Sequence, residues 1–316
     1  MNFTLRVLGT ASAKPVPERH QSAQVLSVHG RFFLIDCGEA VQRQLLRYRV
    51  PMMKIDSIFL SHIHGDHLFG LFPLLSTMGL QARTAPLNIY APANFAPILK
   101  FYLSYFGEGL AFEIRHVALD MKAPEVVYKT KSVEISAFPL DHKIDTFGFL
   151  FREKEPPYNV RKECIPEYGL TLTEIGTLKR GEDVRREDGT LIPVATAAYK
   201  PYVPRSYAYC SDTRTFPELA QWVKGVTLLY HEATYPEEYA DQARQRHHST
   251  AAQAARCALE AGAGRLLLGH FSSRLKDLTP LLTEAQAIFP DTVLLNDGDL
   301  FDLPLLRDPV SSNLPD

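Results

Sequence analysis

The sequence lacks the features that mark membrane-spanning, secreted and disulfide-bonded proteins. It contains no run of about twenty apolar residues, so we expect no membrane span. The N-terminal residues 1–6 do not have the charged-then-apolar layout of a signal peptide. Its cysteines are scattered, without a Cys-x-x-Cys pair, which favours reduced thiols and a cytoplasmic protein: Cys37, Cys164, Cys210 and Cys257.

An excess of charge of one sign is also missing. The 34 basic side chains stand against 36 acidic ones, for a net charge of −2. A nucleic-acid partner would therefore have to meet a local basic patch. The hydrophobic share of 46% is ordinary for a globular protein, and no repeat of fixed period is found. We expect one domain over residues 1–316.

What the chain does contain is a recurring pattern of short apolar runs, each followed by polar residues. Ligand sites in layered α/β proteins lie past the carboxyl ends of strands, because loops converge there while the sheets stay rigid. Two of these runs, at 32–35 and 58–60, are followed by helix-like stretches at 40–48 and 68–78. The pattern predicts an α/β fold with strands at 32–35, 58–60, 133–137, 207–209, 228–230 and 266–268.

A segment of different composition, approximately 152–205, interrupts this pattern. It is dense in charge, proline and glycine, and Asp188-Gly189 between Val184 and Ile192 predicts a small hairpin. A structureless loop of this length would be unusual inside a compact domain. We therefore expect an inserted flexible arm here, and a frayed, disordered tail at 307–316.

Three histidines and an aspartate fall within six residues, directly after the apolar run 58–60: His62, His64, Asp66 and His67. Neutral imidazoles and carboxylates suit Zn²⁺ and similar divalent metals. In extended backbone, residues two apart point the same way, so His62 and His64 can bind one ion. Asp66 and His67 lie where the chain turns and could face a second ion. The alternative, four unrelated polar residues in a solvent loop, is disfavoured because composition alone does not gather histidines this way.

Further downstream, His142, Asp212 and His270 each follow a strand-like run. Taken alone, each would more often be a surface or hydrogen-bonded residue. Together with the histidine cluster they provide one more terminal ligand for each of two metals and a carboxylate able to bridge both.

At this point the sequence resembles the metallo-β-lactamase superfamily, whose signature His-x-His-x-Asp-His stands at residues 62–67. More specifically it resembles the ribonuclease Z family of tRNA 3′-processing endonucleases. Stretches that match this family in order cover nearly the whole chain: 9–12, 36–40, 61–70, 211–214, 231–234, 248–250 and 270–274.

The resemblance implies a metallo-β-lactamase αββα sandwich, two mixed sheets with helices on the outer faces, plus an arm. It implies two Zn²⁺ per subunit, with Mn²⁺ or another divalent ion as an alternative, and a homodimer. One ion would be held by His62, His64 and His142, the other by Asp66, His67 and His270, with Asp212 bridging. The implied activity is cleavage of precursor tRNA after the discriminator nucleotide, which leaves a 3′-hydroxyl on the tRNA and a 5′-phosphorylated trailer.

Two stretches depart from the family pattern. The family's early loop, Pro-x-Lys-x-Arg-Asn, is linked to how a 3′ CCA end is treated, and this chain has Pro-Val-Pro-Glu-Arg-His at 15–20. The family's arm carries a Gly-Pro pair, and this chain has Gly169-Leu170.

Catalysis needs a proton acceptor and a proton donor beside the metals. Asp66 could accept the proton of the attacking water, and His248 is the candidate acid because the family keeps a histidine before Ser-Thr. Glu232 could orient His248 and raise its basicity, or it could instead satisfy a backbone amide. His247 is interpreted as a surface residue.

Substrate contacts need phosphate-binding cations. Arg274, four residues after His270, is placed for a phosphate near the metals, and Lys179 and Arg180 on the arm could meet the tRNA backbone. The alternative for the arm is a solvated charged face, because acidic residues are interleaved.

The alternative function is a phosphodiesterase of the same fold that acts on small phosphodiesters. A third class, a non-catalytic binding module, is disfavoured because it would not need so complete a ligand set.

Overall fold

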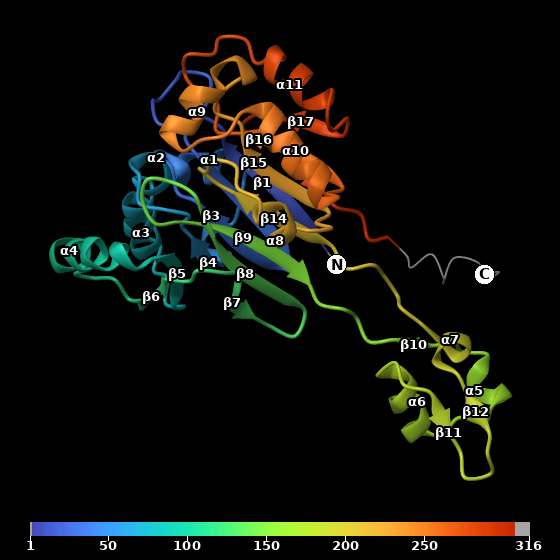
Figure 1. Cartoon of the computed structure of the whole chain (residues 1–316). Coiled ribbons are helices and arrows are strands. Elements are labelled where there is room, and N and C mark those ends of the chain that lie inside the picture. The colour runs from blue at the N-terminus through green and yellow to red at the C-terminus, as the bar shows by residue number, and fades with distance from the viewer. Residues whose placement is uncertain (1, 307–316) are drawn as a thin grey trace. The chain divides into compact units, whose positions relative to one another are not determined.

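Two mixed sheets of seven strands each dominate the larger of two compact units, which comprises Met1–Lys129, Glu134–Phe151 and Ser206–Leu303 (Figure 1). The structure is a computed structural model that describes residues 2–306. The first sheet has the order β18 (Leu300–Asp302), β1 (Phe3–Gly9), β2 (Ala23–Val28), β3 (Arg31–Ile35), β4 (Ile55–Phe59), β5 (Leu87–Pro92), β6 (Ile114–Leu119). The second has the order β17 (Thr292–Leu294), β16 (Arg265–Gly269), β15 (Leu228–Glu232), β14 (Ser206–Cys210), β9 (Thr146–Glu153), β8 (Val133–Leu140), β7 (Glu125–Lys129).

Each sheet contains a parallel block. Strands β3 to β6 pair in parallel in the first sheet, and β14 to β17 do so in the second. The strands of such blocks are covered on both faces and read as continuous apolar runs, as in the fully buried β14 and β15. Their carboxyl ends meet at one edge of each sheet, which gathers the loops that follow them.

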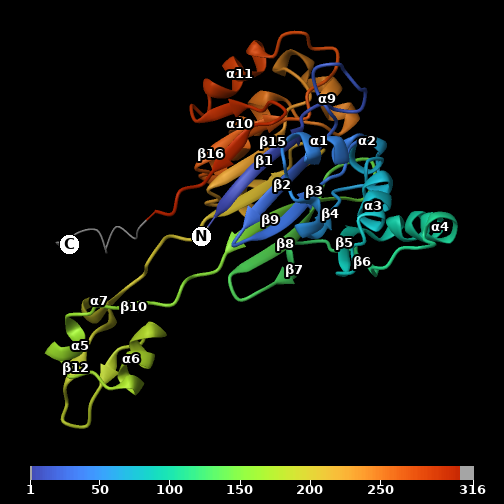
Figure 2. The same cartoon turned by 180° about the vertical axis from the view of Figure 1, so that it is seen from behind.

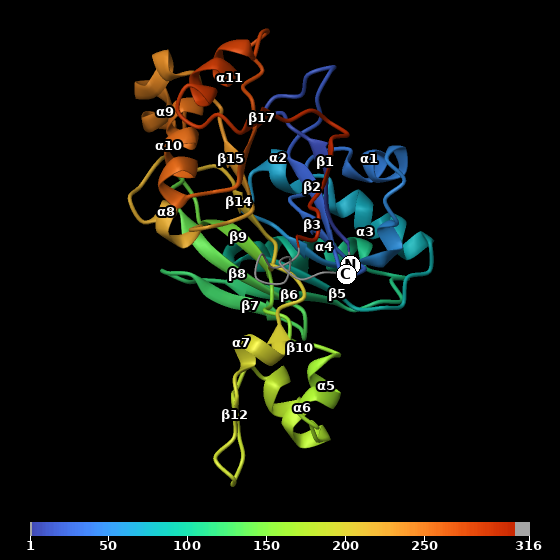
Figure 3. The same cartoon turned by 90° about the vertical axis from the view of Figure 1, so that its right-hand side faces the viewer.

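Helices cover the outer face of each sheet (Figures 2 and 3). On the first sheet, buried side chains of three helices share a core cluster with strand residues: α1 (Val41–Arg47), α3 (Leu71–Leu80) and α4 (Ala96–Phe106). On the second sheet, a separate cluster does the same with α8 (Leu219–Trp222), α10 (Ala251–Ala261) and α11 (Thr279–Gln286).

Aromatic side chains fill the space between the two sheets. The ring of Phe33 on β3 lies 5.7 Å from that of Phe151 on β9. Phe59 on β4 packs edge-on against Phe149 at 5.2 Å, a favoured arrangement of aromatic rings. The result is a helix–sheet–sheet–helix sandwich, the α/β architecture that the family resemblance implies.

The small residues of α10 explain why this helix packs closely on β15 and β16. Its buried positions Ala251, Ala254, Ala255 and Ala258 recur at helical spacing and form one apolar face. Thr250 begins the helix with a capping box, and Gly262 ends it in the left-handed conformation. This start of the helix fixes the position of the two residues just before it, His248 and Ser249.

The helix expected at 68–78 is split. A short helix α2 (Gly65–Leu68) ends before Gly70, and α3 begins at Leu71. Gly70 donates its N–H to the Cys37 carbonyl at 2.8 Å. A Cβ on this glycine would lie 2.0 Å from the Gly38 carbonyl oxygen, so only glycine allows the contact. The break therefore seats the histidine segment against the loop that follows β3.

The second compact unit is built on Arg152–Arg205, with Thr130–Val133 and the described residues 304–306. It contains β10 (Asn159–Val160) paired with β13 (Ala198–Tyr199), and β11 (Val184–Arg185) paired with β12 (Leu191–Ile192). Three helices, α5 (Cys164–Glu167), α6 (Leu172–Lys179) and α7 (Val194–Ala197), close a small core of its own. The hairpin predicted at Asp188-Gly189 is present, and Gly189 has a φ of +86°. The tail expected at 307–316 lies outside the described residues.

Candidate metal centre

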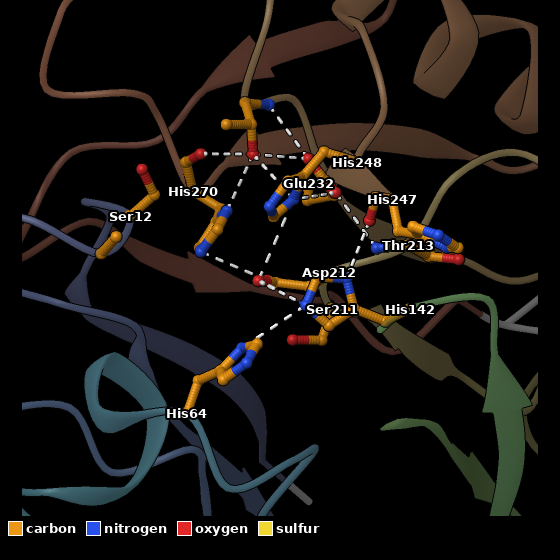
Figure 4. A network of polar contacts seen from close by, with 12 residues as sticks. Ser12, His64, His142, Ser211, Asp212, Thr213, Glu232, His247, His248 and His270 are labelled. Carbon is orange, nitrogen blue, oxygen red and sulfur yellow. Dashed lines mark hydrogen bonds and ion pairs between the residues drawn. The ribbon is translucent and has the colours of Figure 1, made fainter. Parts of the chain in front are cut away.

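The seven residues expected to bind metal lie in loops that follow the strands of the first unit. His62 and His64 follow β4, and Asp66 and His67 lie in α2. The other three follow strands of the second sheet: His142 after β8, Asp212 after β14 and His270 after β16. Figure 4 shows His64, His142, Asp212 and His270 turned toward a common space.

Four of these side chains form one group whose ligand atoms all lie within 4.8 Å of one another: His62, His64, His142 and Asp212. The Nδ1 atom of His64 lies 3.0 Å from His62 Nε2 and 3.4 Å from His142 Nε2. The Oδ2 atom of Asp212 lies 3.8 Å from His62 Nε2 and 3.9 Å from His142 Nε2.

A second group contains Asp66, His67 and His270. The two Nε2 atoms of His67 and His270 are 3.3 Å apart, and Asp66 Oδ2 lies 3.5 and 3.4 Å from them. Asp212 faces this group with its other oxygen, Oδ1, which is 3.4 Å from His67 and 3.2 Å from His270. One carboxylate therefore presents an oxygen to each group.

These distances fit divalent cations. Ligand nitrogens at about 2.0–2.1 Å from a tetrahedral Zn²⁺ lie about 3.3 Å from one another. Asp212 Oδ1 is buried and accepts no hydrogen bond from the described residues, which would be costly without a cation. The first group offers three nitrogens and an oxygen, the donor set that zinc prefers.

The outward-facing nitrogens of four histidines are held by oxygen atoms. The Nδ1 atoms lie 3.0 Å from Ser61 Oγ for His62, 2.7 Å from Asp36 Oδ2 for His67, 2.8 Å from the His247 carbonyl for His142, and 2.9 Å from Thr234 Oγ1 for His270. Carbonyl and carboxylate oxygens only accept, so the Nδ1 atoms of His67 and His142 donate. The hydroxyls of Ser61 and Thr234 donate to Asp36 and Glu232, and therefore accept from the Nδ1 atoms of His62 and His270. In their neutral forms these four rings present the Nε2 lone pair to the centre, as metal binding requires.

Asp36 is a residue that the sequence analysis did not single out. It is fully buried after β3 with a φ of +53°. Besides His67 it accepts from the Ser61 backbone N–H at 2.7 Å and from the Tyr209 hydroxyl at 2.6 Å. The sequence offered one signal for Asp36, its position directly after an apolar run. Its role could not be predicted from that, because the residues it contacts lie far along the chain.

Glu232 and Thr234 connect the centre to His248. Oε1 of Glu232 accepts from the Thr213 backbone N–H at 3.0 Å and lies 2.8 Å from His248 Nδ1. Both alternatives for Glu232, an amide acceptor and a partner of His248, therefore hold together. Thr234 Oγ1 lies 2.6 Å from Glu232 Oε2 as well as beside His270. Thr234 was missed because nothing in a lone threonine marks this role.

His247 is more than a surface residue. Its carbonyl holds His142, and its ring nitrogen Nδ1 lies 3.0 Å from Asp141 Oδ1. The backbone of His247 is left-handed, with a φ of +57°, where it ends α9 (Ala240–Arg246). Asp141 also accepts from Arg214 Nε at 2.5 Å. Through His247, the segment before His248 is therefore hydrogen-bonded to the loop that carries Asp141 and His142.

Curated relatives match the chain over nearly its full length. A protein named Ribonuclease Z from Cytophaga hutchinsonii is 44% identical over 302 residues, which is 95% of this chain and 96% of that protein. Another of that name from Bacteroides fragilis is 40% identical over 296 residues, covering 94% of this chain and 97% of that protein. The chain belongs to the ribonuclease Z family.

Solved structures agree with this membership. The crystal structure of human tRNase Z, short form, is 25% identical with a TM-score of 0.69, covering 96% of this chain and all of that one. The metallo-β-lactamase fold protein YhfI from Bacillus subtilis is 20% identical with a TM-score of 0.67, covering 95% of this chain and 99% of that one, which bears on the fold alone. The expected metallo-β-lactamase fold is confirmed. A family model described as Anti-Pycsar protein Apyc1 matches residues 3–154.

The charges in this ribonuclease Z centre favour cations. Burial and the neighbouring His67 lower the pKa of His62 well below its usual value, so its imidazole is neutral. Burial would lower the pKa of His67, but Asp212, Asp36 and Asp66 raise it well above its usual value. Carboxylates therefore surround this ring in excess, and bound cations would neutralise them.

A cavity of about 750 Å³ opens over the centre and is lined by residues of the first unit. Four cationic side chains line it: Lys14, Lys143, Arg246 and Arg274. Arg274 thus lies where a phosphate near the metals could reach it.

Lys179 and Arg180 lie at the end of α6 in the second unit, and both are exposed. Arg180 pairs with Glu182 at 3.1 Å, as the alternative of a solvated charged face requires. Lys179 forms no ion pair with a described residue.

Proposed function

We propose that this ribonuclease Z family member is a zinc-dependent endoribonuclease that removes 3′ trailers from precursor tRNA. The cut would fall after the discriminator nucleotide and leave a tRNA 3′-hydroxyl and a 5′-phosphorylated trailer. The observation that carries the proposal is the pair of ligand groups joined by Asp212, in a chain 44% identical to a named Ribonuclease Z.

Two Zn²⁺ per subunit would be held by the two groups, His62, His64 and His142 on one side and Asp66, His67 and His270 on the other, with Asp212 between them. Mn²⁺ or another divalent ion would suit the same donors. Bound ions would act as Lewis acids toward the phosphodiester and lower the pKa of water. Everything else in the reaction falls to side chains of the protein.

Asp66 is proposed to accept the proton of the attacking water. Its Oδ2 accepts the Ala13 backbone N–H at 2.6 Å and faces His67 and His270. Burial would raise its pKa, but the neighbouring His67 and His270 rings lower it, so the carboxylate is ionised. No hydrogen bond or ion pair with a described residue involves Oδ1, which leaves that oxygen able to take up a proton.

His248 is proposed as the general acid for the departing 3′-oxygen. Burial would lower its pKa, but Glu232 and Asp212 raise it to about 9, so the ring carries a proton at neutral pH. Glu232 lies 2.8 Å from Nδ1, which leaves Nε2–H as the donor to the leaving oxygen. Such an acid typically contributes about 10²–10⁴-fold in rate.

The tRNA contacts proposed are Arg274 beside the centre and Lys179 and Arg180 on α6. Arg274 lines the cavity over the metal centre, where a guanidinium can bind a phosphate in bidentate fashion.

We also propose a cytoplasmic homodimer. Three exposed aromatic side chains on α4 support the dimer, because such a patch marks an interaction surface: Phe101, Tyr105 and Phe106. No described helix is long and apolar enough to cross a membrane.

Hydrolysis of small phosphodiesters is the second candidate. It is favoured by one observation: the cavity over the centre is lined entirely by first-unit residues, so a small substrate would need nothing from Arg152–Arg205.

The deciding experiment is incubation of the purified protein with an end-labelled tRNA precursor that carries a 3′ trailer. We expect one cut after the discriminator nucleotide, which a chelator abolishes and Zn²⁺ restores. The variant Asp212→Ala should not cut, because both ligand groups lose the oxygen that joins them. Turnover of a small phosphodiester without tRNA cleavage would favour the second candidate.

A further inference from the structure

A second cavity, of about 470 Å³, lies beside the metal centre and shares His248 with the larger one. Its lining includes Asp141, Arg214, Phe216, Asp241 and Arg244. We propose that this second cavity binds the nucleoside whose 3′-oxygen leaves, the last nucleoside of the mature tRNA. The inference rests on the proposed function and extends it to a subsite.

The charge of the two cavities differs in a way that separates phosphates from nucleosides. In the larger cavity, four cationic side chains are accompanied by one carboxylate outside the ligand set, Glu39. In the second cavity, apart from the shared His248, two arginines are balanced by two aspartates, and Phe216 and Pro217 add apolar surface. A net cationic cavity suits the phosphate-bearing trailer, whereas a balanced one with an aromatic ring suits an uncharged base and ribose.

The reaction divides the substrate in the same way. Water forms the new bond to phosphorus, and the bond between phosphorus and the 3′-oxygen breaks. The leaving oxygen takes the proton of His248 and becomes the 3′-hydroxyl, while the phosphate stays on the trailer. Because the acid must touch the leaving oxygen, the leaving nucleoside lies on the His248 side. His248 is the side chain that lines both cavities and therefore stands at their border.

The walls of the second cavity are held in place by contacts with one another and with the core beneath them. The ring of Phe216 packs edge-on against Trp222, with centroids 5.3 Å apart. Arg214 is tied to Asp141 at 2.5 Å through Nε and by a backbone hydrogen bond of 3.0 Å. Arg244 is exposed and forms no ion pair with a described residue, so its guanidinium is available to the ligand. A fixed ring and a free cation are what stacking and edge recognition of a base need.

The test compares two synthetic precursors that differ at the last nucleoside of the tRNA portion: one has its ordinary base, the other is abasic. Single-turnover cleavage and substrate affinity are measured for the wild type, Phe216→Ala and Phe216→Tyr. We expect Phe216→Ala to lower kcat/KM roughly tenfold on the ordinary precursor. On the abasic precursor this variant should match the wild type, since no base remains to contact the ring. Phe216→Tyr should retain most of the wild-type rate on both.

Phe69→Ala is the matched control, because Phe69 is an exposed ring that lines the larger cavity only. Whatever factor this control loses should be the same on both precursors. Arg244→Ala should again lose more on the ordinary precursor, and as an exposed residue it has no folding role to confuse the result.

An equal loss by Phe216→Ala on both precursors, with wild-type zinc content, would overturn the inference while leaving the proposed function standing. If the wild type does not cut the ordinary precursor, the proposed function fails, and the inference fails with it.

Discussion

Replacing Thr234 by valine tests how the protein prepares His270 for a metal. The hydroxyl of Thr234 lies 2.6 Å from Glu232 Oε2 and 2.9 Å from His270 Nδ1. Burial would raise the pKa of Glu232, but His248 lowers it, so this carboxylate is ionised and can only accept. The hydroxyl therefore donates to Glu232 and accepts from His270, which fixes the ring with its Nε2 lone pair toward Asp66 and Asp212.

Valine has nearly the shape of threonine but cannot make either hydrogen bond. Because Thr234 is 4% exposed, water cannot replace the lost hydroxyl easily. Loss of a partner that orients a metal ligand typically costs about 10–100-fold in metal affinity, or about 1.4–2.7 kcal/mol. We expect this loss at the site of Asp66, His67 and His270, and little change at the other site.

The assay is zinc content measured at a series of buffered free Zn²⁺ concentrations. Thr234→Val should bind its second equivalent 10–100-fold more weakly than the wild type, as estimated above. Thr234→Ser is the control, since it keeps the hydroxyl and should bind both equivalents nearly as tightly as the wild type. Identical zinc curves for Thr234→Val and the wild type would refute the reasoning, and so would an equal loss in Thr234→Ser.

Three further predictions concern the acid, the second unit and its stability. In Glu232→Gln the pKa of His248, about 9 in the wild type, should fall because the carboxylate beside it is lost. Single-turnover cleavage should then begin to decline at a lower pH than in the wild type. An unchanged pH profile would show that Glu232 does not keep His248 protonated. Deleting residues 155–200 should cripple tRNA cleavage while sparing a small phosphodiester, because every residue that lines the cavity over the centre lies outside this segment; equal loss on both substrates would make the segment a folding element. Protection of the α6 amides against hydrogen exchange, relative to the intrinsic rate at each pH, should fall as pH is lowered from about 4.5 toward 2. The hydrogen bond from Arg186 lowers the pKa of Glu174 to about 2, and its stabilisation is lost when Glu174 protonates; Glu174→Gln should lack this dependence.

The sequence predicted the parts of the site that are local in the chain. Residues 62–67 bring their ligands together within one turn, and the apolar runs before His142, Asp212 and His270 form the strands that carry them. The strands before Asp212 and His270, β14 and β16, belong to one parallel block, so their carboxyl ends meet, and the pattern of runs was enough to indicate this.

What the sequence could not predict depends on contacts between distant segments. Asp36 acts on His67 through space, and Thr234 acts on His270 across 36 positions. His247 supports His142 with a carbonyl, which every residue possesses and no side-chain pattern reveals. The break in the helix at Gly70 has the same origin, since it is set by the Gly38 carbonyl and not by local helix propensity.

The central claim is that two groups of ligands share Asp212, and metal stoichiometry tests it most directly. Protein prepared without chelator should contain two equivalents of divalent cation per chain by elemental analysis. Asp212→Ala should lose affinity for both equivalents together, because its two oxygens face the two groups separately. At most one equivalent in the wild type, or an Asp212→Ala variant that retains both with wild-type affinity, would contradict the account.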